Sequence, residues 1–226
     1  MDRPITTLFM LMSVDGKITP GISDSLDFDQ DLPHIKGVGE GLSQYYDIEK
    51  TTDLWSLNSG RVQAKIGVNE MDMPAKTPVS FVLIDNNHLK QHGVEYFCAL
   101  SRTFVIVTSN PEHPAFSVKS DNLRIIYQDT LNLPDMLRQL KEVHGCDRLT
   151  IQTGGTLNGL FLRQKLFDYV DIVVVPLLVG GKDTTTLIDG DSIIEAQQLS
   201  DLGVLALESV QPLEHSYVRL RYKVIS

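Results

Sequence analysis

This 226-residue sequence has few cysteines, fewer basic than acidic residues and no long apolar run, and each of these shortages excludes a class of protein. It has two cysteines, Cys98 and Cys146, which lie far apart and outside any CxxC spacing, so neither a disulfide scaffold nor a cysteine-rich metal site is expected. Its longest apolar run is far too short to span a membrane, and its first residues lack the basic-then-apolar pattern of a signal peptide. We therefore expect a reduced, cytoplasmic protein with no membrane partner.

Basic residues are scarce relative to acidic ones. There are 20 Lys and Arg against 29 Asp and Glu, which gives a formal net charge of −9 at pH 7. Sequence-independent binding of nucleic acid relies on clustered Lys and Arg, so no nucleic-acid partner is predicted. A phosphorylated ligand is not excluded, because one or two local cations and backbone amides suffice to bind it.

Segments with the apolar pattern of buried strands alternate with segments of helical pattern along most of the chain. Apolar, β-branched runs predict strands over residues 6–12, 52–57, 79–84, 103–107, 123–127, 149–151 and 171–176. Helices are predicted over residues 35–50, after Asn132 and after Gly155, whereas residues 20–33 are expected to form a loop. Residues 204–210 and 217–224 alternate around a turn and predict an antiparallel hairpin. The chain is thus expected to form a single α/β domain over residues 1–226, with a mixed, mostly parallel sheet flanked by helices.

A glycine pair, Gly154 and Gly155, lies between a predicted strand and a predicted helix. Such a turn lets backbone N–H groups and the helix dipole approach a phosphate. It matches neither the G-x-G-x-x-G fingerprint nor a Walker loop, and a glycine pair alone is more often a tight turn.

Two other predicted strand ends carry polar side chains. Ser59 and Arg61 follow one strand, and Thr108 and Ser109 end another. Ligands of open α/β sheets bind at the carboxyl ends of the strands, and a guanidinium can pair with a phosphate. A nucleotide cofactor is therefore the first hypothesis.

Several other patterns favour structural interpretations. Asp27, Asp29 and Asp31 copy the first ligand spacings of an EF-hand, but the expected Gly and Glu are absent. His88 and His92 have helical i, i+4 spacing without a third ligand, so no metal site is predicted. Asp15 precedes Gly16, and an Asp-Gly turn is usually structural, although a carboxylate at a strand end can also relay a proton.

Residues 12–18 (MSVDGKI) resemble the first-strand signature of the riboflavin-biosynthesis pyrimidine reductases, whose fold is like that of dihydrofolate reductase. Residues 152–162 (QTGGTLNGLFL) are similar to the Glu-Gly-Gly segment and following helix of that family, and residues 173–181 (VVVPLLVGG) to its next strand and glycine turn. Together with residues 79–85 and 103–109, the resemblance covers nearly the whole chain in the right order.

The resemblance implies an NADPH-dependent reductase that converts the ribose of a ribosylaminopyrimidine phosphate into a ribityl chain, and a homodimer. It places Gln152 and Lys50 on the substrate side, and Asp15, at its strand end, is the catalytic candidate. The implied cofactor contacts are Met12, Ser59, Arg61, Val62, Thr108, Ser109, Gly154, Gly155, Thr156 and Leu157. Arg61 stands where the family usually has Thr, and its cation can face the 2′-phosphate of NADPH.

Most departures from the family pattern lie on the substrate side. An acidic loop over residues 22–32 replaces a Gly-Ser-Trp region of the family. Where the family has an Arg/His-rich helix, this chain has a single basic residue, Lys50, and where the family has a Glu before the glycine pair, it has Gln152. The riboflavin pyrimidine is therefore the default substrate, with another small carbonyl, imine or pterin-like compound as an alternative. A non-catalytic nucleotide-binding or regulatory protein with the reductase fold is the rival hypothesis.

Overall fold

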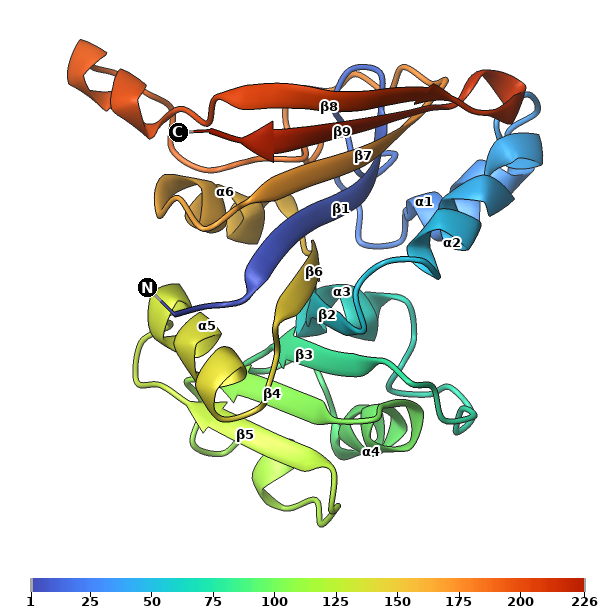
Figure 1. The fold of residues 1–226 in the computed structure, drawn as a ribbon. Coiled ribbons are helices and arrows are strands. Elements are labelled where there is room, and N and C mark those ends of the chain that lie inside the picture. The colour runs from blue at the N-terminus through green and yellow to red at the C-terminus, as the bar shows by residue number, and fades with distance from the viewer. Residues whose placement is uncertain (1, 226) are drawn as a thin grey trace. The chain divides into compact units, whose positions relative to one another are not determined.

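A computed structural model describes residues 2–225 (Figure 1). The chain divides into two compact units, described separately below. Unit 1 comprises residues 2–5 and 53–153, and unit 2 comprises residues 6–52 and 154–225. The prediction that the chain acts as a single domain stays a prediction.

Unit 1 contains a fully parallel sheet. Its strands, in spatial order, are β5 (Leu123–Tyr127), β4 (Phe104–Thr108), β3 (Ser80–Ile84), β2 (Trp55–Ser59) and β6 (Arg148–Gln152). Its helices are α3 (Gly60–Lys65), α4 (Gln91–Leu100), α5 (Leu133–Glu142) and a 3-10 turn, η3 (Pro114–Phe116). Because all five strands run the same way, their carboxyl ends meet at one edge of this sheet (Figure 1).

The core of unit 1 follows from strand alternation. Alternate residues of β3 and β4, such as Leu83 and Ile106, pack with Phe97 of α4 in one apolar cluster. Helix α5 begins as predicted, because the Asn132 side chain accepts a hydrogen bond from the Asp135 amide. Helix α4 was not expected from the sequence, where the residues after Asp85 showed only a turn signal.

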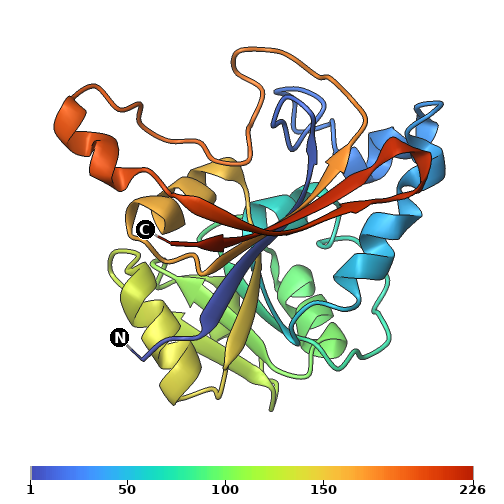
Figure 2. The ribbon, with the colours of Figure 1, turned by 45° about the horizontal axis from the view of Figure 1, so that its top comes forward.

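Unit 2 contains a mixed sheet. Strands β1 (Ile5–Ser13, of which Ile5 is counted in unit 1) and β7 (Tyr169–Val175) are parallel. Strands β9 (Val218–Val224) and β8 (Leu205–Pro212) continue from β7 as the predicted antiparallel hairpin (Figure 2). The mixed, mostly parallel α/β class expected from the sequence is therefore confirmed.

Three α-helices and four 3-10 turns accompany these strands. They are α1 (Phe28–Asp31), η1 (Leu32–His34), η2 (Gly39–Gly41), α2 (Ser43–Glu49), α6 (Gly155–Arg163), η4 (Ala196–Asp201) and η5 (Glu214–Ser216). Phe9 of β1 stacks on Tyr45 of α2 at 5.0 Å between ring centroids. Around this pair lies an apolar cluster that includes Val173 and Tyr217.

Two predictions for unit 2 were wrong in detail. The helix expected over residues 35–50 begins only at Ser43, because the segment before it forms 3-10 turns around Gly39 and Gly41. The expected loop over residues 20–33 contains α1, which is capped by the Asp27 side chain. Asp27 thus acts as a helix cap and not as a calcium ligand.

Among residues 2–225, no helix is both long and apolar enough to cross a membrane.

Candidate functional site

The predicted cofactor residues Ser59, Arg61 and Val62 lie where β2 passes into α3. Ser59 ends the strand, and Gly60 begins the helix with Arg61 exposed beside it. A Cβ atom on Gly60 would lie 2.3 Å from the Cβ of Asp85, so only glycine fits against that side chain. The junction therefore packs directly against the residue that follows β3.

Asp85 is a buried carboxylate that connects several segments of unit 1. Its oxygens accept hydrogen bonds from the Leu89 amide at 2.9 Å, from His88 Nδ1 at 2.8 Å and from His113 Nε2 at 3.0 Å. Burial alone would raise its pKa, but the hydrogen bonds from His113, Leu89 and His88 outweigh burial and lower the pKa of Asp85 to about 2. Asp85 is thus ionised at neutral pH.

Thr108 and Ser109 end β4 as predicted, and a neighbouring side chain holds both. The Asn86 side-chain oxygen accepts hydrogen bonds from the Thr108 hydroxyl at 3.0 Å and from the Ser109 amide at 2.8 Å. The Ser109 hydroxyl donates to the same oxygen. Asn86 therefore fixes the end of β4 against the turn after β3.

Gln152 ends β6 beside β2 in a polar chain. The Asn58 amide donates to the Ser56 hydroxyl at 2.8 Å, and Ser56 donates to the Gln152 side-chain oxygen at 3.0 Å. Asn58 and Gln152 are register partners in the two parallel strands. The chain of bonds orients the Gln152 amide at the carboxyl end of the sheet of unit 1.

In unit 2, the glycine pair begins α6 as predicted. Gly154 is the residue before the helix, and nothing lies within 4 Å of a Cβ atom placed on it. On Gly155, by contrast, a Cβ atom would lie 2.4 Å from the Thr186 carbonyl oxygen and 2.3 Å from the Asp189 carboxylate. Gly155 is thus required by packing against residues 184–189, while Gly154 leaves room for a ligand.

Helix α6 also provides the other two predicted cofactor residues. Thr156 is exposed and Leu157 half-buried in its first turn. Gly154, the N-cap residue, has no side chain that could cap the helix, and the Asp189 carboxylate lies beside Gly155. Backbone N–H groups of a first helical turn can bind an anion.

Met12 and Asp15 lie at the end of β1 and in the turn that follows. Met12 is half-buried and pairs in register with Val174 of β7. The Asp15 carboxylate accepts hydrogen bonds from the Ser13 hydroxyl at 2.6 Å, the Val179 amide at 3.1 Å and the Gly180 amide at 2.6 Å. These bonds lower the pKa of Asp15 to about 2, so at neutral pH the group is a carboxylate and not a proton donor. Its catalytic assignment stays a prediction.

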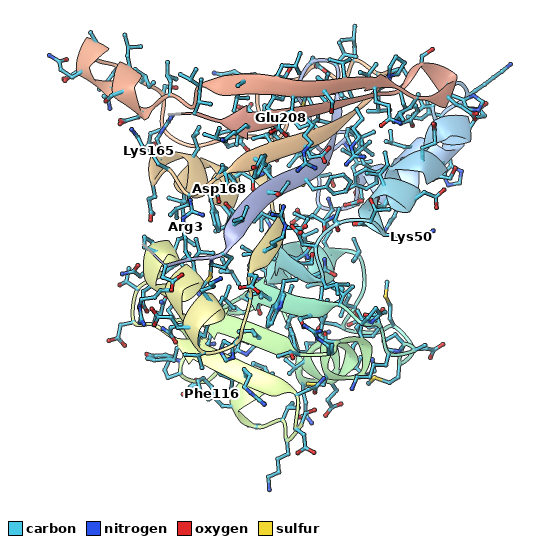
Figure 3. All side chains as sticks on the ribbon, viewed as in Figure 1. Arg3, Lys50, Phe116, Lys165, Asp168 and Glu208 are labelled. Carbon is cyan, nitrogen blue, oxygen red and sulfur yellow. The ribbon has the colours of Figure 1, made fainter. Side chains whose placement is uncertain are left out.

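Lys50 follows α2, exposed to solvent (Figure 3). Its Nζ atom pairs with the Asp47 carboxylate at 2.8 Å, and both side chains are largely exposed. An exposed pair of this kind contributes little to stability, so the amine can exchange its partner for a ligand. The substrate role of Lys50 stays a prediction.

Unit 1 thus brings Ser59, Arg61, Val62, Thr108 and Ser109 to the edge where β2 and β4 end, and Gln152 to the end of β6. Within unit 2, Met12 and Asp15 follow β1, Gly154, Gly155, Thr156 and Leu157 open α6, and Lys50 follows α2.

Sequence reasoning missed the residues that hold these positions. Asp85 and Asn86 were recognised only as a turn, and His113 lies in a loop with no periodic signal. Lys17 is buried, and its Nζ atom donates to the Thr184 carbonyl at 2.7 Å. Within residues 2–225, no group of three or more His, Cys, Asp or Glu side chains is arranged to hold a metal ion.

The two glycines that begin α6 differ in what they tolerate, which gives a prediction. Gly155→Ala should lower the free energy of unfolding by about 1–3 kcal/mol, because its Cβ displaces the Thr186 backbone. Gly154→Ala is the matched control and should leave stability within about 0.5 kcal/mol of the wild type, since its backbone is extended and its surroundings are open. Urea unfolding of both variants measures the difference, and equal stabilities would contradict the packing argument.

The pKa of Asp85 predicts an acid-dependent stability. A carboxyl group whose pKa is lower in the folded than in the unfolded state stabilises the fold above its ordinary pKa of 3.8, and the contribution is lost as the pH falls towards 2. The wild type should be more stable than Asp85→Asn by about 2 kcal/mol at pH 6, with the gap closing between pH 4 and pH 2. Urea unfolding across this range measures the gap. A gap independent of pH would show that the carboxylate's charge is not involved.

The chain is similar to riboflavin-biosynthesis proteins in sequence. It is 28% identical over 199 residues to 2,5-diamino-6-ribosylamino-4(3H)-pyrimidinone 5′-phosphate reductase of Methanothermobacter thermautotrophicus, covering 85% of this chain and 87% of the relative.

Solved structures with low sequence identity share the fold. RibD of Acinetobacter baumannii matches all of this chain with a TM-score of 0.67 at 16% identity, and the chain spans 59% of that protein. A pyrimidine reductase-like protein from Corynebacterium diphtheriae also matches all of the chain, with a TM-score of 0.67 at 13% identity over 93% of its own length.

A family model described as the RibD C-terminal domain matches residues 38–211, which is most of the chain. This match confirms the resemblance found in the sequence motifs. The family implies a nicotinamide cofactor. Within unit 1, the exposed Arg61 provides a cation for a phosphate, and within unit 2, the turn at Gly154 is open. The chain belongs to the RibD C-terminal domain family, the pyrimidine reductases of riboflavin biosynthesis.

Proposed function

We propose that this chain is an NADPH-dependent reductase that acts on a ribosylaminopyrimidine 5′-phosphate and reduces its ribose to a ribityl chain. The family match carries the proposal, because residues 38–211 include every predicted cofactor residue except Met12. The relative from Methanothermobacter, similar over most of its length, is named as a reductase of such a phosphate.

NADPH would supply the hydride, and the chain would supply binding and orientation. The predicted cofactor residues include Ser59, Arg61 and Ser109 of unit 1 and, separately, Gly154 and Thr156 of unit 2. In unit 1, the exposed Arg61 guanidinium provides a charge for a phosphate. In unit 2, the first turn of α6 provides backbone N–H groups.

The substrate side supports a second candidate, a small carbonyl, imine or pterin-like compound. Lys50 is the C-cap residue of α2 and pairs with Asp47. It is the basic residue of this segment, where the family has several basic residues. Gln152 is a neutral amide oriented by Ser56, where the family has a carboxylate. Both differences weaken the case for the riboflavin substrate without affecting the cofactor residues.

The experiment that tests the function is NADPH oxidation, followed at 340 nm, with the ribosylaminopyrimidine phosphate and then with a panel of small carbonyl, imine and pterin compounds. Turnover of the pyrimidine supports the main proposal, and turnover of another compound alone supports the second candidate. Binding of NADPH without oxidation across the panel favours a non-catalytic nucleotide-binding protein.

Arg61 gives a prediction about the cofactor. Arg61→Ala should weaken NADPH binding about tenfold and leave NADH binding nearly unchanged, because only NADPH carries a 2′-phosphate for the guanidinium to pair with. Titration of cofactor fluorescence with the wild type and the variant gives both dissociation constants. An unchanged NADPH to NADH ratio would show that Arg61 does not contact the 2′-phosphate.

We also propose that the chain forms a homodimer through the β8–β9 hairpin. Its directly paired residues Leu207 and Tyr222, and Val210 and Leu220, share one face of the sheet, together with Leu205, Pro212, Val218 and Val224. Leu207 and Val210 are 56% and 53% exposed, which is unusual for a large apolar face of a monomer.

The opposite face of the hairpin is polar, and its two arginines form ion pairs. Arg219 forms a two-pronged contact with the buried Asp171, and Arg221 contacts Asp171 and Glu208. The apolar face itself carries no charged side chain. An uncharged apolar face complements a second copy of itself, as a two-fold dimer requires.

A glutamate introduced on the apolar face of the hairpin should affect dimer formation differently from a glutamate introduced on the polar face. Val210→Glu should convert the dimer into a monomer, because it places a charge within the apolar face. Gln211→Glu, on the polar face one residue further on, should leave a dimer of twice 25.2 kDa. Light scattering after size exclusion measures the mass, and a monomeric wild type would refute the interface.

We propose a reducing compartment, the cytoplasm, for this protein. Cys98 and Cys146 are both free thiols. Burial raises the pKa of Cys146 to about 12, so this thiol stays protonated and unreactive.

A further inference from the structure

The turn after β3 joins the three strand ends that carry the predicted cofactor residues of unit 1. Asp85 packs against Gly60, the neighbour of Arg61, while the next residue, Asn86, holds Ser109. The same turn continues into His88, whose backbone amide donates to the Asp85 carboxylate. Arg61, Ser109 and His88 are thus grouped around one rigid turn.

The imidazole of His88 has a fixed orientation. Its Nδ1 atom lies 2.8 Å from Asp85 Oδ1, and because an ionised carboxylate only accepts, Nδ1 carries the proton. The ring is about half exposed, with 47% of the side chain accessible to solvent. Its Nε2 atom makes no hydrogen bond to any residue within 2–225, so Nε2 is the atom offered to a ligand.

The second histidine on Asp85 differs in its protonation. His113 is fully buried, and its Nδ1 atom accepts a hydrogen bond from the Ala115 amide at 3.1 Å. Its Nε2 atom therefore carries a proton that it donates to Asp85, and the ring needs no positive charge. His113 thus occupies Asp85 Oδ2, while Asp85 Oδ1 is the oxygen that orients His88.

Lys90 and His92, which follow His88 in the chain, have partners of their own. Lys90 Nζ pairs with the Glu70 carboxylate at 2.8 Å. His92, one helical turn further on, has its Nε2 atom 2.7 Å from the Met71 carbonyl oxygen. His88 and His92 are therefore held by different partners and do not form the metal pair that their spacing resembles.

We propose that His88 is a second cationic contact for the 2′-phosphate of the cofactor, with Asp85 as the residue that positions it. Nε2 of the imidazolium donates to a phosphate oxygen beside the Arg61 guanidinium, while Asp85 holds Nδ1. A dianionic phosphate stabilises the protonated ring, as opposite charges within hydrogen-bonding distance do. The inference rests on the proposed function, because it requires a phosphorylated dinucleotide at this edge.

The test compares the dissociation constants of NADPH and NADH, measured by cofactor fluorescence, in four proteins. His88→Gln removes the charge but keeps a polar side chain, and it should weaken NADPH binding about tenfold while leaving NADH unchanged. His88→Arg retains a cation and should keep the preference for NADPH. His92→Gln, the matched control, should bind both cofactors as the wild type does.

The outcomes separate this inference from the proposed function. A wild type that binds neither dinucleotide overturns the proposed function and this inference with it. A wild type that binds NADPH, with His88→Gln preserving the NADPH to NADH ratio, overturns the inference alone. Equal weakening of both cofactors by His88→Gln also overturns it, since the side chain then only maintains the turn.

Discussion

The organisation of unit 1 depends on one buried carboxylate. Asp85 lies immediately after β3 and satisfies its charge entirely with donors from its own turn and from His113. A buried charge is costly unless it is hydrogen-bonded on both oxygens, and here it is. The arrangement requires glycine at position 60, since any side chain there would collide with Asp85. The local path of the chain at the end of β2 is thus set by a residue about 25 positions further on.

Unit 2 has a comparable anchor in the turn after β1. Asp15 binds the amides of Val179 and Gly180, and Lys17 binds the Thr184 carbonyl, so the long connection after β7 is attached to this turn at several points. That connection then packs on Gly155 at the start of α6. The MSVDGKI motif therefore has a structural role, which is to anchor the connection after β7, in addition to any role in binding.

The strands were largely predictable from the sequence, while the contacts that define the site were not. Buried β-branched runs such as β4 and β7 have a local signal, and the Asn132 cap marks the start of α5. The role of Gly155 has no local signal, because it depends on Thr186 and Asp189 folding back on the helix. His113 was likewise invisible, since its partner Asp85 is 28 residues away. The positions of Arg61 and Ser109 after strand ends were predictable because strand ends can be recognised, and their role in binding stays a prediction.

The irregularity in β8 bears on how this chain tolerates length changes. The pairing of β8 with β9 shifts between Leu207 and Ser209, so Glu208 is an extra residue in the strand. Because successive strand residues point to opposite faces, the bulge at the extra residue is what keeps Leu205 and Leu207 on the same side as Val210. Loss of Glu208 would leave Leu207, Ser209 and Val210 consecutive and paired one-to-one with Tyr222, Arg221 and Leu220, so the two apolar residues would stay on one face. The hairpin should therefore tolerate a one-residue deletion at Glu208, whereas a deletion elsewhere in β8 would turn part of the strand over and place polar residues on the apolar face.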